Sequence, residues 1–229
     1  MAIGSPRTTA HLRTPRAAAI AGLLFSVLLL VAFLLLRMAV PADPRETGAW
    51  LRTDAGTVAL ALNLIPFAGI AFLWFIGVLR DRLGHGEDRF FATVFFGSGL
   101  VFLATLFVTV ALAGGLLIGF SSMSREPVDT TTFQFARAAV YTMMNIYVIK
   151  IAAVFMISTS TISLYTAIAP RWLAVLGYVL SGLLLLGSYF ISWSFVVFPL
   201  WVFLLSLSIL ADNLRTSATP PEQGGQSMV

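Results

Sequence analysis

The stretch FQFARAAVYTMMNIYVIKIAAVFMISTSTISLYTAIA runs from Phe133 to Ala169 and holds an ionisable residue, Lys150, deep inside an apolar segment. As an α-helix at about 1.5 Å per residue it would reach roughly 55 Å, whereas the hydrocarbon core of a bilayer is about 30 Å thick. Part of this helix must therefore leave the bilayer, tilt or break. We expect it to stand at the centre of a membrane bundle.

The composition places the chain in the integral membrane class. Apolar residues make up 59% and charged residues 10%, against roughly 45 to 50% and 25% in soluble domains. There is no cysteine, which excludes disulfides, iron-sulfur clusters and thiolate zinc sites. The two histidines, His11 and His85, lie outside the apolar runs, so two membrane histidines for a haem are not available. We expect no cofactor.

The apolar runs predict an all-α, polytopic membrane bundle of six transmembrane helices. Residues 17–211 form this domain, between tails at 1–16 and 212–229 that we expect to be disordered and cytoplasmic. The predicted spans are 17–36, 57–79, 90–120, 133–169, 172–191 and 195–211. The last two are inferred from a weak break at Ser192, Trp193 and Ser194, because 40 apolar residues cannot cross once.

The arginines predict the orientation. With the amino terminus inside, the internal segments carry eight arginines and the external ones five, which favours cytoplasmic termini. A basic lead, an apolar run and the sequence Val40-Pro41-Ala42 also fit a signal peptide, but the run exceeds the usual 7 to 15 residues, so we favour an uncleaved helix. Of the 14 basic residues 13 are Arg, which resembles a high-GC bacterium and indicates an inner-membrane protein.

Lys150 is the most unusual residue of the predicted spans. A charge in the bilayer costs about 2.5 to 3.5 kcal/mol unless it snorkels or finds a partner. All acidic residues lie in predicted connectors or tails, so no carboxylate from a span can pair with it. Taking Arg137 as the external boundary puts Lys150 roughly 20 Å deeper. Several outcomes stay open: snorkelling with hydrogen bonds to Asn or Tyr neighbours, a water-filled or carbonyl-lined cavity, an anionic ligand or lipid headgroup, or loss of the proton.

Polar residues around Lys150 are the candidate ligand- or lipid-binding site. Arg137, Tyr141 and Asn145 share one helix face at four-residue spacing, whereas Lys150 lies about 140° round from Asn145. Tyr147 and Thr161 are better partners for Lys150 by angle. The alternative is an ordinary hydrogen-bonded seam between helices. The full candidate set is Lys150, Tyr147, Asn145, Tyr141, Arg137 and, from the second span, Asn63.

A stripe of small residues, Ala111, Gly115 and Gly119, recurs every four residues in the third span. Such a stripe lets another helix approach closely, and we interpret it as a packing surface within the chain.

These residue types also exclude classes of function. The absence of carboxylates from the spans argues against a proton- or sodium-coupled pump. Ser98 lies between two glycines, but no histidine is available to activate it. The charges lie in connectors and tails, which indicates contact with anionic headgroups and not with nucleic acid. We therefore expect a non-enzymatic protein that binds a lipid, a small anion, a partner membrane protein or a second copy. The alternatives are a small dimeric transporter or channel with a path past Lys150 and Asn63, and, third, a lipid-modifying enzyme.

One short motif adds to this. Gly77-Val-Leu-Arg80-Asp81-Arg82-Leu-Gly84 resembles the glycine, leucine, Asp-Arg, glycine signature in the cytoplasmic loop between helices two and three of the major facilitator superfamily. The resemblance covers about eight residues, and His85 and Gly86 stand where that signature has basic residues. It implies that Asp81 and Arg82 lie in a cytoplasmic loop, where they lock helices together through charge and helix-dipole contacts.

Overall fold

The computed structural model describes residues 14–41, 43, 48–83, 89–121, 130–166, 168–187 and 193–218. These ranges are helical and contain no strand. The helices are α1 (Thr14–Ala39), α2 (Trp50–Thr53), α3 (Ala55–Leu83), α4 (Arg89–Ser121), α5 (Thr131–Thr142), the π-helix η2 (Met143–Val148), α6 (Ile149–Thr166), α7 (Arg171–Gly187) and α8 (Ser194–Ala218).

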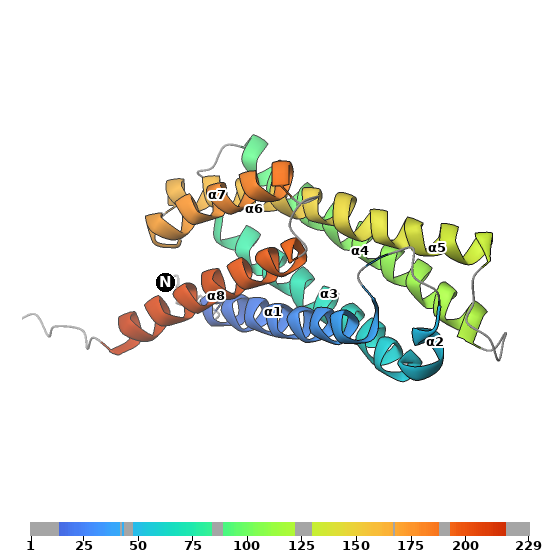
Figure 1. Ribbon diagram of the computed structural model, residues 1–229. Coiled ribbons are helices and arrows are strands. Elements are labelled where there is room, and N and C mark those ends of the chain that lie inside the picture. Colours follow the sequence, from blue (N-terminus) through green and yellow to red (C-terminus); the bar gives the residue numbers. More distant parts are fainter. Residues whose placement is uncertain are drawn as a thin grey trace, which may run out of the picture.

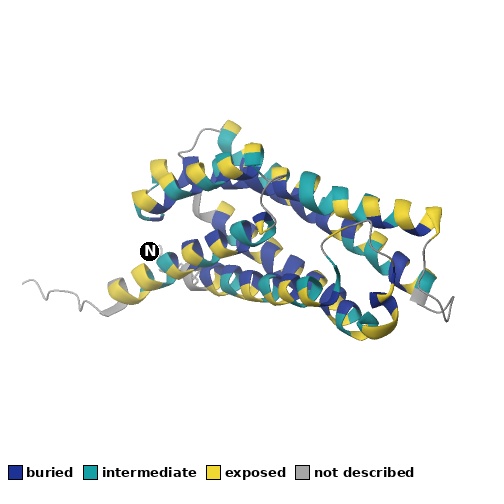
Figure 2. Cartoon of the chain, viewed as in Figure 1, coloured by how far each residue is buried: buried dark blue, intermediate teal, exposed yellow. Residues whose placement is uncertain are grey.

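The helices form two layers that run along one long axis (Figure 1). One layer contains α1, α3 and α8, and the other contains α5, η2, α6 and α7; α4 packs against both α3 and α6. The start of α1 and the end of α8 lie at the same end of the bundle, which we call the termini end; the opposite end, where α2 lies, is the α2 end. Figure 2 shows buried residues between the layers and exposed residues on their outward faces.

The membrane class predicted from composition is supported by helix length. Five of the described segments are long and apolar enough to cross a membrane: Ala17–Ala39, Ala55–Arg80, Phe90–Phe120, Thr131–Thr166 and Ser194–Arg215. Helices suit such a setting because they satisfy their backbone hydrogen bonds internally. The expected span 172–191, the fifth in chain order, corresponds to α7, which has 17 residues and is shorter than these five. The count of six crossings is therefore not established by helix length.

The observed helices differ from the expected ones in three places. The segment expected as one long helix is interrupted by η2, so that α5 and α6 are separate α-helices. The short helix α2 was not expected in the first connector. Asp81 and Arg82 belong to the last turn of α3, although the predicted loop starts at Arg80; the structure does not describe their side chains.

Phenylalanines form the centre of the core. Phe72 of α3 is fully buried, and its ring centroid lies 4.7 Å from that of Phe25, 5.3 Å from Phe102 and 5.1 Å from Phe155. It also lies 6.0 Å from Phe198 of α8. These rings come from five different helices. The hydrophobic effect does not drive helices together inside lipid, so close packing of this kind supplies much of the association energy.

Gly22 allows α1 and α8 to come into close contact. A Cβ placed on Gly22 would lie 2.0 Å from Ser206 Oγ and 2.8 Å from the ring of Phe75. Ser206 Oγ is itself buried without a hydrogen-bond partner in the described structure. Gly22→Ala is therefore expected to destabilise the protein by about 1 to 3 kcal/mol, the typical cost of overpacking. Unfolding in mixed detergent micelles measures this change in the free energy of unfolding.

The neighbouring serine supplies the control. Ser206→Ala is expected to be neutral or slightly stabilising, because it removes a buried hydroxyl that makes no hydrogen bond. Combined with Gly22→Ala it should recover part of the loss, since the nearest clashing atom is gone. A double variant as unstable as the sum of the two single variants would show that the α1–α8 contact does not depend on this pair.

Candidate functional site

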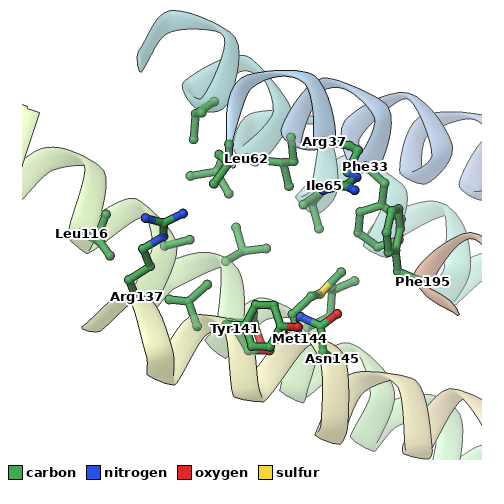
Figure 3. A pocket seen from close by; sticks show the side chains of 18 of the residues that line it. Phe33, Arg37, Leu62, Ile65, Leu116, Arg137, Tyr141, Met144, Asn145 and Phe195 are labelled. Atoms are coloured by element: carbon green, nitrogen blue, oxygen red, sulfur yellow. Dashed lines mark hydrogen bonds between the residues drawn. The ribbon is translucent and has the colours of Figure 1, made fainter. Parts of the chain in front are cut away.

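A cleft of about 300 Å³ lies between the two layers toward the α2 end of the bundle. Most of its lining is apolar: Leu62 and Ile65 of α3 stand on one side, and Tyr141 and Met144 stand across from them (Figure 3). The volume is at the lower end of the range of small-molecule sites, about 300 to 1,000 Å³.

The cleft is present because α8 starts part of the way along the bundle and does not extend to the α2 end. The ring of Phe195, in the first turn of α8, packs edge-on against Phe33 of α1 at 5.4 Å. From this level α8 runs toward the termini end, packing on α1 and also touching α6. On the α2 side of the two rings, α8 no longer stands between the layers. Phe33 and Phe195 therefore form the floor of the cleft, as Figure 3 shows.

Arg137 lies at the other end of the cleft, where the sequence predicted a functional arginine. Only 6% of its surface is exposed, and Nη2 donates hydrogen bonds to the carbonyl oxygens of Pro41 at 3.1 Å and Asp43 at 2.8 Å. Both acceptors follow the end of α1. Arg137 therefore ties α5 to the segment after α1, and it brings a positive charge to the boundary of the cleft.

Arg37 is a second arginine at the cleft, and it was not among the site residues predicted from the sequence. It lies in the last turn of α1, and its guanidinium carbon stands 5.7 Å from the centroid of the Trp193 ring, a cation–π contact. Trp193 in turn stacks on Phe195 at 6.0 Å. In the sequence Arg37 directly follows a long apolar run. That pattern is typical of any helix end, so it does not indicate a binding residue.

Tyr141 and Asn145 follow Arg137 along the same wall. The four-residue spacing that placed these three residues on one face is preserved up to the start of η2, and all three line the cleft. The side-chain amide of Asn145 donates to the carbonyl oxygen of Tyr141 at 2.9 Å. The π-helix itself contributes Met144, whose flexible side chain adapts to different neighbours. Such π segments occur often at functional sites.

The charge of the cleft has one sign. Two guanidinium groups, those of Arg37 and Arg137, are among its lining, and none of the described residues that line it is acidic. Trp50 of α2 also lines it, with an indole N–H that is buried and has no acceptor in the described structure. An apolar cleft with cationic groups at its edges suits a molecule with an apolar body and an anionic end.

The remaining candidate residues lie elsewhere. Lys150 is exposed on α6 and does not line the cleft, and Tyr147 is 54% exposed. Asn63 is exposed on α3, and its amide donates to the carbonyl oxygen of Ala59 at 2.9 Å, within its own helix. Thr161 bonds to the hydroxyl of Tyr178 at 2.6 Å and is not a partner of Lys150. The structure thus divides the predicted set into a cleft group and a surface group.

The small-residue stripe faces outward. Ala111, Gly115 and Gly119 are all exposed, and no atom lies within 4 Å of a Cβ built on either glycine. In the described part of the chain no other helix packs on this stripe, because the opposite face of α4, with Phe102 and Leu106, is the one turned inward. Nor do three metal-ligating side chains gather anywhere in the ranges described. His85 lies outside those ranges.

Comparison with protein families, with curated proteins and with solved structures finds no match for this chain. The function is therefore inferred from the geometry of the site itself.

Proposed function

We propose that this chain is a non-enzymatic, multi-pass membrane protein that binds an anionic, lipid-like molecule in the cleft between its two helix layers. The observation that supports this most is the combination of an apolar lining with Arg37 and Arg137, and with no acidic side chain among the described residues that line the cleft. The apolar part of such a ligand would replace contacts missing in the cleft, and its anionic group would pair with a guanidinium.

Arg37 gives the level of the cleft in the membrane. The apolar run of α1 before Arg37 covers 17–36, or about 30 Å of helix, the thickness of a hydrocarbon core. Trp193, at the start of α8, lies beside Arg37, and tryptophan favours the interface between membrane and water. We place the membrane boundary at this level. Arg137 then lies beyond the boundary, because it bonds to carbonyls that follow α1.

This level changes the interpretation of Lys150. From Thr166, at the termini end of α6, Lys150 is 16 residues away, or about 24 Å. It therefore belongs to the half of the membrane nearer the α2 end. The sequence-based estimate placed Lys150 further from that end, because it took Arg137 as the membrane boundary. Its side chain leans toward the amino terminus of α6, which points to the α2 end. Snorkelling to the nearby headgroups then accounts for this lysine.

The topology follows as part of the same proposal. With α7 as a short sixth crossing, both termini lie on one side, and the arginine bias puts that side in the cytoplasm. The α2 end would face outward from a bacterial inner membrane. A transport path past Lys150 and Asn63 gains no support, because both residues are exposed and neither lines the cleft.

The proposal is tested by the lipids that stay bound during purification. Arg37→Gln is expected to lower the retention of lipids with acidic headgroups about tenfold, the equivalent of about 1.4 kcal/mol, because a charge-assisted hydrogen bond is lost. Native mass spectrometry of the protein released from mild detergent measures the bound lipid directly.

Two variants serve as controls. Arg80 also makes a cation–π contact at a helix end, with Phe96 at 4.4 Å, but it lies at the termini end and away from the cleft. Arg80→Gln and Lys150→Met are both expected to keep the retained lipid. Equal loss in all three variants would mean that acidic lipids bind the surface without using the cleft, and no retained lipid in the unsubstituted protein would contradict the proposal itself.

A further inference from the structure

Described residues line the cleft at both of its ends along the bundle axis. At the termini end its floor is the contact between Phe33 and Phe195. At the α2 end Arg137 bridges from α5 to the carbonyls of Pro41 and Asp43, and Trp50 of α2 lines the same end. Arg137 and Trp50 therefore stand between the cleft and the α2 end of the bundle.

Three of its long sides are walls. One wall is formed by α1 and α3, which pack together along their length. The back wall is α4, through Leu106 and Val110. The third wall is formed by α5 and η2, which make their helix contacts with α4, with α6 and with each other. Among the described residues the remaining side, between Arg37 and Asn145, is covered by no helix, because α8 starts at the level of the floor.

At the membrane boundary proposed above, this open side lies within the membrane. It begins at the floor, one turn of α1 below Arg37, and reaches the boundary that Arg37 and Trp193 mark. A side opening at this depth meets lipid and not water. Arg37, at the edge of the opening nearer the α2 end, is at the depth of lipid phosphate groups. The apolar part of the cleft, between Arg37 and the floor, suits an acyl chain.

We infer that the cleft takes in a phospholipid with an acidic headgroup sideways, from the leaflet at the α2 end, through the opening between α1 and η2. One acyl chain enters the cleft while the headgroup stays at Arg37. A volume of about 300 Å³ suits a single chain, so the second chain remains in the leaflet. This inference rests on the proposed function, since it names the ligand and the route for the same cleft.

The chain has no cysteine, so a single introduced cysteine carries a nitroxide spin label at one known place. Met144→Cys puts the label in the cleft wall. Leu34→Cys puts it on the outward face of α1, next to Phe33 in sequence and 53% exposed, as the bilayer reference. Thr53→Cys, exposed on α2, is the water reference. Each variant is reconstituted in vesicles of phosphatidylcholine alone or mixed with phosphatidylglycerol.

The environment of each label is measured by how often it collides with two reagents. Oxygen concentrates in lipid, whereas a nickel chelate stays in water. The label at Met144 is expected to resemble that at Leu34, with oxygen collisions several-fold above those at Thr53 and nickel collisions several-fold below. Phosphatidylglycerol is expected to slow the label at Met144 and not at Leu34. Adding Arg37→Gln should abolish that slowing.

Other results overturn the inference in separable ways. Nickel collisions at Met144 as frequent as at Thr53 mean that the cleft opens to water, and a label that meets neither reagent means that it is closed. A label that phosphatidylglycerol does not slow rejects the acidic phospholipid. In each of these cases lipid retained through Arg37 in native mass spectrometry would leave the proposed function standing, whereas absence of retained lipid would remove both.

Discussion

Replacing Phe72 by alanine is expected to destabilise the protein by about 3 kcal/mol. Phenylalanine-to-alanine changes in well-packed cores cost about 3 to 5 kcal/mol, and the lower end applies here because part of that cost is a transfer from water that a membrane core lacks. Phe72 is fully buried and contacts rings of four other helices, including Phe25 and Phe155. Unfolding in mixed detergent micelles, followed by loss of helical circular dichroism, measures the change.

Phe67→Ala on the same helix is the matched control. Phe67 is 62% exposed and lies outside the phenylalanine cluster, so its removal is expected to change the free energy of unfolding by less than about 1 kcal/mol. If both substitutions cost the same, the cluster would not be the main contact between the two layers, and side-chain packing elsewhere would have to hold them together.

Replacing Arg137 by methionine is expected to release the segment after α1. Methionine keeps the apolar stem of the side chain but loses the donors to the carbonyls of Pro41 and Asp43. Hydrogen bonds from charged groups contribute about 1.5 to 3 kcal/mol each, so this local contact should lose about 3 kcal/mol. The expected result is faster hydrogen exchange at Val40 and at Leu51 of α2, measured by mass spectrometry of peptides.

The helices α3 and α6 should keep their protection in this variant, because the hydrogen bonds lost by Arg137 go to the segment after α1, whereas α3 and α6 pack through the core around Phe72. Arg137→Lys is expected to restore only part of the effect, since one ammonium group does not reproduce the planar fork of a guanidinium. Arg80→Met, near the end of α3 that is far from α2, is the comparison, and it is expected to leave the exchange at Val40 and Leu51 unchanged. Global unfolding by Arg137→Met would instead assign this residue to the stability of the whole bundle.

The long apolar runs were predictable because length and composition determine them. The observed α1, α3 and α4 extend the expected spans by only a few residues at each end. A break in the long fourth segment was one of the expected alternatives, but its position at η2 was not predictable, because Met143 to Val148 contains neither glycine nor proline and is typical of ordinary helix. For α7, expected over 172–191, the structure gives Arg171–Gly187, and the expected continuation over 188–191 lies outside the described residues.

The cleft was predictable in part. Arg137, Tyr141 and Asn145 could be grouped because helical spacing places them on one face, and the structure brings all three to the cleft. Arg37 and Phe195 could not be added, since they are 158 positions apart in the sequence and meet the cleft only through the packing of α8 on α1.

Lys150 and Asn63 were predicted as binding residues because polar residues are rare in apolar runs. Rarity in the sequence does not show which way a side chain points. Asn63 is satisfied by the carbonyl of Ala59 in its own helix, and Lys150 lies on the outer surface of α6. The low amphipathic contrast of these helices is the physical reason: when nearly all residues are apolar, the pattern that normally distinguishes an inward face from an outward face is lost.

The unequal lengths of the helices also affect the bilayer around them. At about 1.5 Å per residue, α4 is about 50 Å long and α7 about 25 Å. With α7 as the proposed short crossing, a bilayer that matches one flank of the bundle is mismatched to the other, so it would thicken beside α4 and thin beside α7. Lipids in a thinned annulus are less well packed with their neighbours, and they lose less when one of their tails leaves the leaflet.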